Sequence, residues 1–143
     1  MSQANADAVR AVWPREVDLV EMVRNPELFS PFAAHVDRDI EVVFTTGAPG
    51  VGSLTFHGFA GLVAGWRDWV APYESYRLEV ENFIDAGEEH VLCPARVEAR
   101  TRRDGVLIEH SPAAVFTVRD GQVTQATFHL ERHRAYEAVG LRA

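Results

Sequence analysis

Three turn signals in the second half of the chain constrain its fold most strongly. Aspartate and glycine accept the backbone angles of tight turns, and each signal separates two stretches rich in β-branched and aromatic residues. The signals are Asp85-Ala86-Gly87, Asp104-Gly105 and Asp120-Gly121, and the stretches cover residues 76–85, 90–103, 106–119 and 122–130. Short turns between long strands predict an antiparallel meander.

Alternation within these strands predicts which side chains share a face, because successive residues of a strand point to opposite sides of the sheet. The apolar parity of the second stretch is Val91, Cys93, Ala95, Val97 and Ala99, and the other parity holds Arg96, Glu98, Arg100 and Arg102. The apolar parity of the third stretch is Val106, Ile108, His110, Pro112, Ala114, Phe116 and Val118, and that of the fourth is Thr124, Ala126, Phe128 and Leu130. We expect His110 and Phe128 to face inward, and Arg96 and Glu98 to face outward.

The first half of the chain is predicted to be mainly helical. Pro14 can occupy the first turn of a helix that ends near Asn25, and Pro26 begins a short second helix. Residues 40–44 are typical of a strand, and a loop rich in glycine and proline follows over residues 46–53. An apolar stripe predicts a third helix that lies against the sheet, formed by Leu62, Trp66, Val70 and Tyr73. A short helix over residues 132–139 closes the chain.

Helices followed by a long meander, with one helix across its apolar face, predict an α+β fold. We expect a cone-shaped half-barrel, in which a curved antiparallel sheet carries N-terminal helices and a central helix packed on its concave face. No repeat or linker divides the sequence, so we expect one domain over residues 1–143 with an ordered core at about 14–141. Such a cone contains a cavity.

The charged residues exclude several classes of function. All 14 basic residues are arginine, so the chain has no lysine for a phosphate-binding loop, a Schiff base or a general base. The glycine-rich loop over residues 46–53 is therefore expected to be a mobile rim over the cavity. The formal net charge of −7 disfavours nucleic acid and anionic membranes as partners. A small, mostly apolar molecule is the favoured ligand.

Cysteine usage and the N-terminal residues bear on the cellular setting. Cys93 is the only cysteine, so one chain can form neither an internal disulfide nor a cysteine-based metal site. This predicts a reducing, cytoplasmic setting. Residues 1–13 lack the basic and apolar regions of a signal peptide, and no stretch approaches the roughly 20 apolar residues of a membrane span.

His110 is the strongest candidate for chemistry, because it falls on the inward parity of a central strand. An imidazole in that position can act as a general acid or base near neutral pH. Asp39, at the mouth of the first strand, is the best candidate for its orienting partner. Each residue also has a structural interpretation: His110 as a core histidine satisfied by one hydrogen bond, and Asp39 as a turn or cap residue.

Aromatic residues are numerous enough to line an apolar pocket, and they would equally form a core. The residues predicted to contact a substrate are Trp13, Phe56, Trp66, Tyr73, Phe116 and Phe128. His129 and His133 straddle the expected junction of the last strand and the last helix, so they do not share a secure helical face and we predict no metal site.

Two segments resemble SnoaL-like proteins of the nuclear transport factor 2-like superfamily. They are HGFAGLVAGWRDWVAPYESYRLEVENFIDAG, over residues 57–87, and VFTVRDGQVTQATFHLERHRAYEAVGL, over residues 115–141. The resemblance implies the cone-shaped fold and a homodimer that pairs through the outer face of the sheet. It also implies chemistry without a metal or organic cofactor. The superfamily hosts cyclases, isomerases, dehydratases, epoxide hydrolases and proteins with no chemistry.

The resemblance also reveals two departures from the enzymes of the superfamily. It places Phe128 where polyketide cyclases and epoxide hydrolases have an acidic residue, and Val42 where ketosteroid isomerases have their base. Two hypotheses remain. The first is an enzyme for a hydrophobic cyclic or polyketide-like molecule, with His110 as general acid or base and Asp39 as its partner. The second is a non-catalytic module that binds a ligand or partner through the same cavity.

Overall fold

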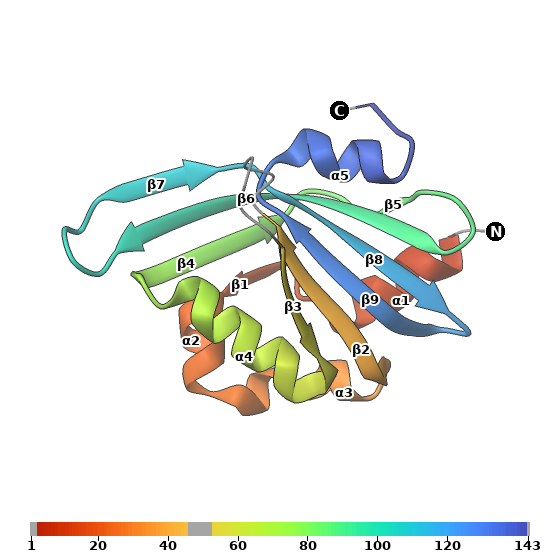
Figure 1. Cartoon of the computed structure of the whole chain (residues 1–143), viewed down its shortest axis with the longest axis horizontal. Coiled ribbons are helices and arrows are strands. Elements are labelled where there is room, and N and C mark those ends of the chain that lie inside the picture. The colour runs from red at the N-terminus through yellow and green to blue at the C-terminus, as the bar shows by residue number, and fades with distance from the viewer. Residues whose placement is uncertain (1–2, 46–52, 143) are drawn as a thin grey trace.

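The computed structural model describes residues 3–45 and 53–142, and no helix in these two ranges is long and apolar enough to cross a membrane. The described strands form one curved, unclosed sheet that carries helices (Figure 1). The helices are α1 (Gln3–Val12), α2 (Leu19–Arg24), the 3-10 helix η1 (Pro26–Phe29), α3 (Ser30–Ala33), α4 (Gly58–Val70) and α5 (Arg132–Ala138). The strands are β1 (Glu16–Asp18), β2 (Val36–Thr45), β3 (Leu54–His57), β4 (Tyr73–Val80), β5 (Ile84–Asp85), β6 (His90–Thr101), β7 (Leu107–His110), β8 (Ala113–Arg119) and β9 (Gln122–His129). This is the α+β, cone-shaped half-barrel that the sequence predicts.

The long strand β6 joins two halves of the sheet. Its first part pairs with β5 and β8, and its second part pairs with β4 and β7. The change of partners falls at Pro94 in β6 and at Pro112, which lies between β7 and β8. A proline has no N–H to give to a ladder, so it interrupts strand pairing. The stretch over residues 106–119, expected as one strand, is therefore two strands in different halves of the sheet.

One strand pair corrects the expectation of a purely antiparallel sheet. The strand order is β1-β4-β6-β8-β9-β2-β3, and β5 and β7 also pair with β6. β2 and β9 run parallel, with Phe44 opposite Phe128. The other pairs between described strands are antiparallel. The meander thus ends beside the first long strand of the chain, although the two strands are far apart in sequence.

The N-terminal region differs from the single helix expected to begin at Pro14. α1 ends at Val12, and β1 follows and pairs with β4. α2 begins only after Asp18, whose carboxylate accepts hydrogen bonds from the N–H groups of Val20 at 3.0 Å and Tyr76 at 3.2 Å. One side chain therefore caps α2 and joins this helix to β4.

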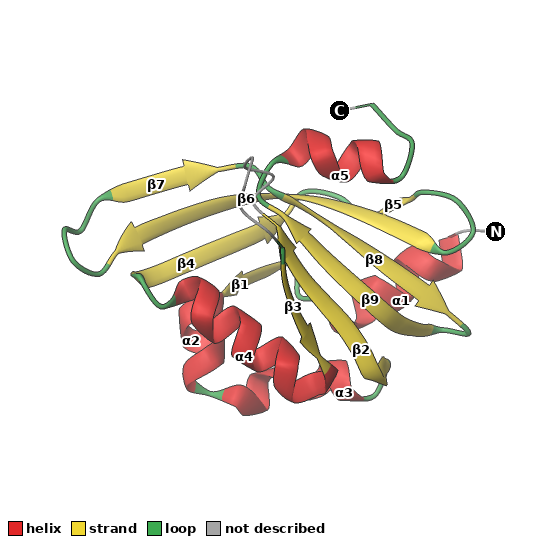
Figure 2. Ribbon diagram, viewed as in Figure 1, coloured by secondary structure: helices red, strands yellow, loops and turns green. Residues whose placement is uncertain are grey.

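The two faces of the sheet carry different clusters of apolar residues. α1, α2 and α4 cover the concave face, and α5 lies on the opposite face (Figure 2). The main core lies on the concave side and includes Val9, Leu62 and Cys93, whereas Leu92 and Ala135 belong to a smaller cluster under α5. Neighbouring residues of β6 thus face opposite clusters, as the alternation predicts. The expected outward side chains, Arg96 and Glu98, are exposed.

α4 approaches the sheet closely at Gly65. A Cβ atom built on this glycine would lie 2.6 Å from Cε1 of Phe44 and 3.0 Å from Cδ1 of Phe56. Packed aromatic rings have little room to move, so a side chain at this position would push the helix away from the sheet. The absence of a side chain at Gly65 therefore sets the distance between α4 and the concave face.

Replacing Gly65 with alanine should lower the free energy of unfolding by about 1–2 kcal/mol. The steric cost, about 2–3 kcal/mol, exceeds the gain in helix propensity of about 1 kcal/mol. Urea denaturation measures the difference. The control is Ala60→Ser on the exposed side of the same helix, which should change the stability by less than about 0.5 kcal/mol. A Gly65→Ala protein as stable as the wild type would contradict this close packing.

Candidate functional site

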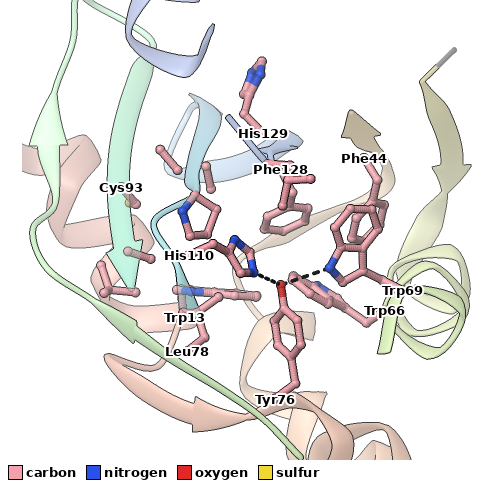
Figure 3. A pocket seen from close by; sticks show the side chains of 16 residues that line it. Trp13, Phe44, Trp66, Trp69, Tyr76, Leu78, Cys93, His110, Phe128 and His129 are labelled. Carbon is pink, nitrogen blue, oxygen red and sulfur yellow. Dashed lines mark hydrogen bonds between the residues drawn. The ribbon is translucent and has the colours of Figure 1, made fainter. Parts of the chain in front are cut away.

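An apolar pocket lies between α4 and the concave face of the sheet, and Figure 3 shows the side chains that line it. Its wall contains Trp13, Phe44, Trp66, Trp69, Tyr76, Leu78, Val80, Cys93, Ala95, His110, Pro112, Ala113, Ala114, Phe128, His129 and Leu130. No aspartate, glutamate or arginine is among these described residues. The cavity volume is about 30 Å³, which is room for one or two water molecules. The pocket is therefore apolar and narrow.

Aromatic rings fill most of the space. The ring centroid of Phe128 lies 4.8 Å from that of Trp66, 5.1 Å from that of Phe44 and 5.6 Å from that of Trp13. Phe128 is only partly buried, whereas the three rings around it are buried. Binding of an organic ligand larger than a few atoms therefore requires one of these rings to rotate. Phe128 is the first candidate, because it is the least buried of the four.

Three polar side chains from three elements form a chain along the pocket wall. Nε1 of Trp69, in α4, donates a hydrogen bond of 3.0 Å to Oη of Tyr76, in β4. The same oxygen lies 3.4 Å from Nε2 of His110, the last residue of β7. Figure 3 shows the three side chains pointing toward one another. The contact to His110 is long for a hydrogen bond.

Strand register explains why Tyr76 and His110 meet. Val97 of β6 is opposite both Leu78 and His110, and Ala99 of β6 is opposite both Tyr76 and Ile108. Tyr76 and His110 therefore project from the same face of the sheet, two strands and one diagonal step apart. Since β7 ends at His110, the imidazole stands at the bend where the two halves of the sheet separate.

The second ring nitrogen of His110, Nδ1, is buried and has no hydrogen-bond partner in the described part of the chain. An indole N–H can only donate, so Oη of Tyr76 accepts from Trp69 and its own hydrogen can point to Nε2 of His110. The phenol can also turn this hydrogen away and accept one from Nε2, because its oxygen has a second lone pair. The imidazole can thus present either an N–H or a lone pair at Nδ1.

Burial sets the protonation of the groups in the pocket. It lowers the pKa of His110 below the ordinary value of 6.5, so the ring is neutral at pH 7. Burial also raises the pKa of Tyr76 well above its ordinary value, although the hydrogen bond from Trp69 opposes this effect. It likewise raises the pKa of the Cys93 thiol, which makes this cysteine a poor nucleophile. The resting site is a neutral imidazole beside a neutral phenol.

The structure brings three of the six predicted aromatic residues into the pocket wall: Trp13, Trp66 and Phe128. Phe116 lies behind them, with its ring centroid 5.9 Å from that of Trp13 and 6.0 Å from that of Phe128. It lines a separate void of about 10 Å³.

The other two predicted aromatic residues support the wall from outside. The ring centroid of Phe56 is 6.0 Å from that of Phe44, and the ring centroid of Tyr73 is 5.3 Å from that of Tyr76. Neither residue lines the pocket. Each holds a pocket residue in place by ring packing.

Asp39 is not brought to His110. It is exposed on β2, and its backbone N–H donates to the carboxylate of Asp37 at 2.8 Å. The register places residue 36 of β2 beside Val123 and residue 44 beside Phe128, so the pocket lies toward the other end of the strand from Asp39. The position next to His110 that the sequence assigned to Asp39 is occupied by Tyr76.

His129 reaches the rim of the pocket but turns away from its polar chain. Its neighbours in register are Thr45 and Ala113, whereas the inward row is formed by the residues one position away, Phe128 among them. Figure 3 shows its side chain directed away from His110. Partial burial lowers the pKa of His129.

Two residues of the polar chain were not singled out from the sequence. Tyr76 shares its strand parity with the apolar residues Leu78 and Val80, and this alternation is the signal that could have placed it inward. Trp69 lies three residues after Trp66, one position outside the predicted helical stripe. Its role depends on the position of α4 over β4, which no local pattern reveals.

Two further expectations concern metal binding and the glycine-rich loop. Within residues 3–45 and 53–142, no group of three or more histidine, cysteine, aspartate or glutamate residues is placed to hold a metal ion. The expected mobile rim over residues 46–53 falls, apart from Ser53, outside the described residues.

The chain is similar to a family of small domains. The family model described as SnoaL-like domain matches residues 19–126, which is most of the chain. None of the curated proteins is similar enough in sequence to count as a match.

Solved structures share the fold at low sequence identity. A protein from Jannaschia sp. CCS1 named as a SnoaL-like polyketide cyclase is 14% identical, with a TM-score of 0.67 over 89% of this chain and 85% of that chain. An NTF2-like protein from Burkholderia xenovorans LB400 is 18% identical, with a TM-score of 0.62 over 98% of each chain. TerC, co-crystallised with polyporic acid, is 22% identical, with a TM-score of 0.65 over 95% of this chain and 98% of that chain. These similarities establish the fold, and any argument about the reaction has to come from the residues of the site.

The lowered pKa of His110 predicts a pH dependence of stability. The native state favours the neutral ring, so the unfolded chain binds a proton first as the pH falls below about 6.5. The stability that depends on the neutral ring is present above that pH and is lost as the pH falls toward the lower pKa of the folded state. The wild type should therefore lose stability relative to a His110→Gln variant between pH 7.5 and pH 5, as measured by urea denaturation. Parallel curves over this range would contradict desolvation of the ring.

Proposed function

The chain belongs to the SnoaL-like domain family, and on this premise we propose that it is a cofactor-independent acid–base enzyme. Its substrate is a hydrophobic cyclic or polyketide-like small molecule. His110 is the general acid or base, and Tyr76 takes the orienting role that the sequence assigned to Asp39. The reaction is of the isomerase, cyclase or dehydratase type.

The observation that carries the proposal is the chain from Trp69 through Tyr76 to His110 in a pocket whose other side chains are apolar except for His129 at the rim. A core histidine needs only partners that satisfy its ring nitrogens. In the described ranges, neither ring nitrogen of His110 is hydrogen-bonded to a backbone carbonyl. Nε2 faces the phenol of Tyr76, and Nδ1 has no partner. A titratable group that is desolvated, held from one side and free on the other is a candidate for proton transfer.

The proton transfer follows from the two states of the imidazole. Neutral His110, with its proton on Nε2, accepts a proton at Nδ1 from an acidic C–H or O–H of the substrate. The imidazolium so formed donates a hydrogen bond from Nε2 to Oη of Tyr76. It then returns the Nδ1 proton to a second position of the substrate. Proton and electron pair are thus conserved within the substrate, and the raised pKa of Tyr76 keeps the phenol neutral throughout.

The character of the pocket supports an apolar substrate. Its walls are aromatic and aliphatic, and an acidic protein of net charge −7 repels polyanions. TerC, which shares the fold, was co-crystallised with polyporic acid, a precedent for a small organic ligand in this architecture. Substrate binding requires rotation of Phe128 or a neighbouring ring, since the cavity measures only about 30 Å³.

A second candidate function is a non-catalytic ligand-binding or dimeric interaction module. Apolar Phe128 and Val42 favour it, because the resemblance places carboxylates at these positions in several enzymes of the superfamily. A homodimer through the outer sheet face and a cytoplasmic setting remain predictions under either function. Sedimentation velocity would test the dimer.

The experiment that separates the two functions detects proton abstraction without knowledge of the final product. A panel of apolar cyclic ketones is incubated with the protein in deuterium oxide, and mass spectrometry measures deuterium taken up beside the carbonyl. The wild type should accelerate exchange for at least one ketone. His110→Gln should lower the enzyme-dependent rate by at least about 100-fold, which is the lower range for loss of a general acid or base.

The controls separate binding from chemistry. Tryptophan fluorescence should show that His110→Gln still binds the same ketone within a few-fold of the wild-type affinity. His133→Gln, at an exposed histidine of α5, should exchange at the wild-type rate. Ketone binding without exchange by the wild type would favour the non-catalytic module, and full exchange by His110→Gln would remove His110 from the mechanism.

A further inference from the structure

Trp66 carries a hydrogen-bond donor that no described residue of the pocket accepts. The side chain belongs to α4, is only 2% exposed and lines the cavity. Its Nε1 is buried without a hydrogen-bond partner among the residues that the structure describes. Burial of an unpaired donor costs free energy, and buried indole N–H groups usually find an acceptor.

The surroundings of Trp66 explain why its donor is unpaired. The ring centroids of Phe44 and Phe128 lie 5.1 Å and 4.8 Å from its own, and neither side chain carries an acceptor oxygen or nitrogen. The ring centroid of Tyr76 is 6.2 Å away, but Oη of Tyr76 is already engaged with Trp69 and His110. A phenylalanine at this position would serve packing alone without leaving a donor unpaired.

We propose that the Nε1–H of Trp66 donates a hydrogen bond to an oxygen of the bound ligand, and that Trp66 thereby selects apolar molecules with a neutral carbonyl group. The inference deepens the proposed function of the same pocket and rests on it for the location of the ligand. Trp66 determines specificity, whereas His110 moves the proton.

The chemistry of the pocket indicates why the oxygen is that of a neutral carbonyl. The described lining holds no arginine to balance a carboxylate or a phosphate, and no acidic residue to bind a cation. A carbonyl oxygen needs only a neutral donor, and an indole N–H in an apolar pocket provides one. The rest of the ligand replaces the contacts that Phe128 makes with the rings around it.

Trp69 and Trp66 differ in this respect, although they lie one turn apart on α4. The indole N–H of Trp69 is engaged by Tyr76 at 3.0 Å, so it is not available to a ligand. Trp69 is therefore an internal reference for any experiment that observes indole N–H groups.

The test uses two ligands of nearly equal shape, cyclohexanone and methylenecyclohexane, which differ by a carbonyl oxygen in place of a CH2 group. The wild-type protein is labelled with 15N-tryptophan, and the indole N–H signals are assigned with Trp66→Phe and Trp69→Phe variants. Saturating cyclohexanone should move the 1H signal of Trp66 downfield, and methylenecyclohexane should not. The signal of Trp69 should move much less with either ligand.

Affinity measurements provide a second, independent readout. Trp66→Phe should weaken cyclohexanone binding by about five- to tenfold relative to methylenecyclohexane, as expected for the loss of one hydrogen bond. The hydrocarbon should bind the variant nearly as well as the wild type. If Trp66→Phe does not fold, Trp13→Phe and Trp69→Phe assign the Trp66 signal by elimination, and this signal in the wild type still decides the question.

Three results would overturn the proposal: no downfield shift of Trp66 with saturating cyclohexanone, equal shifts with both ligands, or no binding of either ligand in the pocket. The first would show that the indole N–H does not donate to the carbonyl oxygen. These outcomes are separate from those of the deuterium-exchange experiment. A pocket that binds ketones through Trp66 without exchange would retain this inference and remove the catalytic one.

Discussion

The packing of α4 against the concave face of the sheet is the constraint on which the pocket depends. Gly65 lets the helix approach Phe44 and Phe56, and this contact positions Trp66 and Trp69 above the strands. The sheet makes the complementary contribution, because it changes strand partners at Pro94 and Pro112 and ends β7 at His110. A helix held farther away would separate Trp69 from Tyr76, and an unbroken strand would carry His110 past the pocket.

Desolvation links this packing to chemistry. The same burial that excludes water keeps His110 neutral at pH 7 and keeps Tyr76 protonated. It also leaves two nitrogens of the pocket wall, Nδ1 of His110 and Nε1 of Trp66, without partners among the described residues. Each unpaired buried group costs about 1–3 kcal/mol. Native proteins contain few such groups. A bound ligand would account for both, because its oxygen accepts from Nε1 of Trp66 and its proton is transferred to Nδ1 of His110.

The sequence predicts the face of the sheet on which a side chain lies better than it predicts which side chains lie next to one another. Alternation places His110 and Phe128 inward and Arg96 outward because the side-chain period of a strand is fixed at two. It fails at Pro112, where the missing N–H divides one expected strand into two. The partner of His110 could not be predicted, since register between strands depends on side chains far apart in the chain. Its carboxylate and its place at the mouth of the first strand favour Asp39, whereas register brings Tyr76 to the imidazole.

In the proposed site, Tyr76 holds the neutral ring of His110 through Nε2 and leaves Nδ1 to the ligand. The most direct measurement is the 15N spectrum of the histidine rings at pH 7.5, in the wild type and in Tyr76→Phe. We expect a neutral His110 ring whose Nε2 signal changes in the variant, while the ring of His129, which points away, is unaffected. A charged His110 ring at this pH, or an Nε2 signal unchanged by loss of the phenol oxygen, would overturn this arrangement.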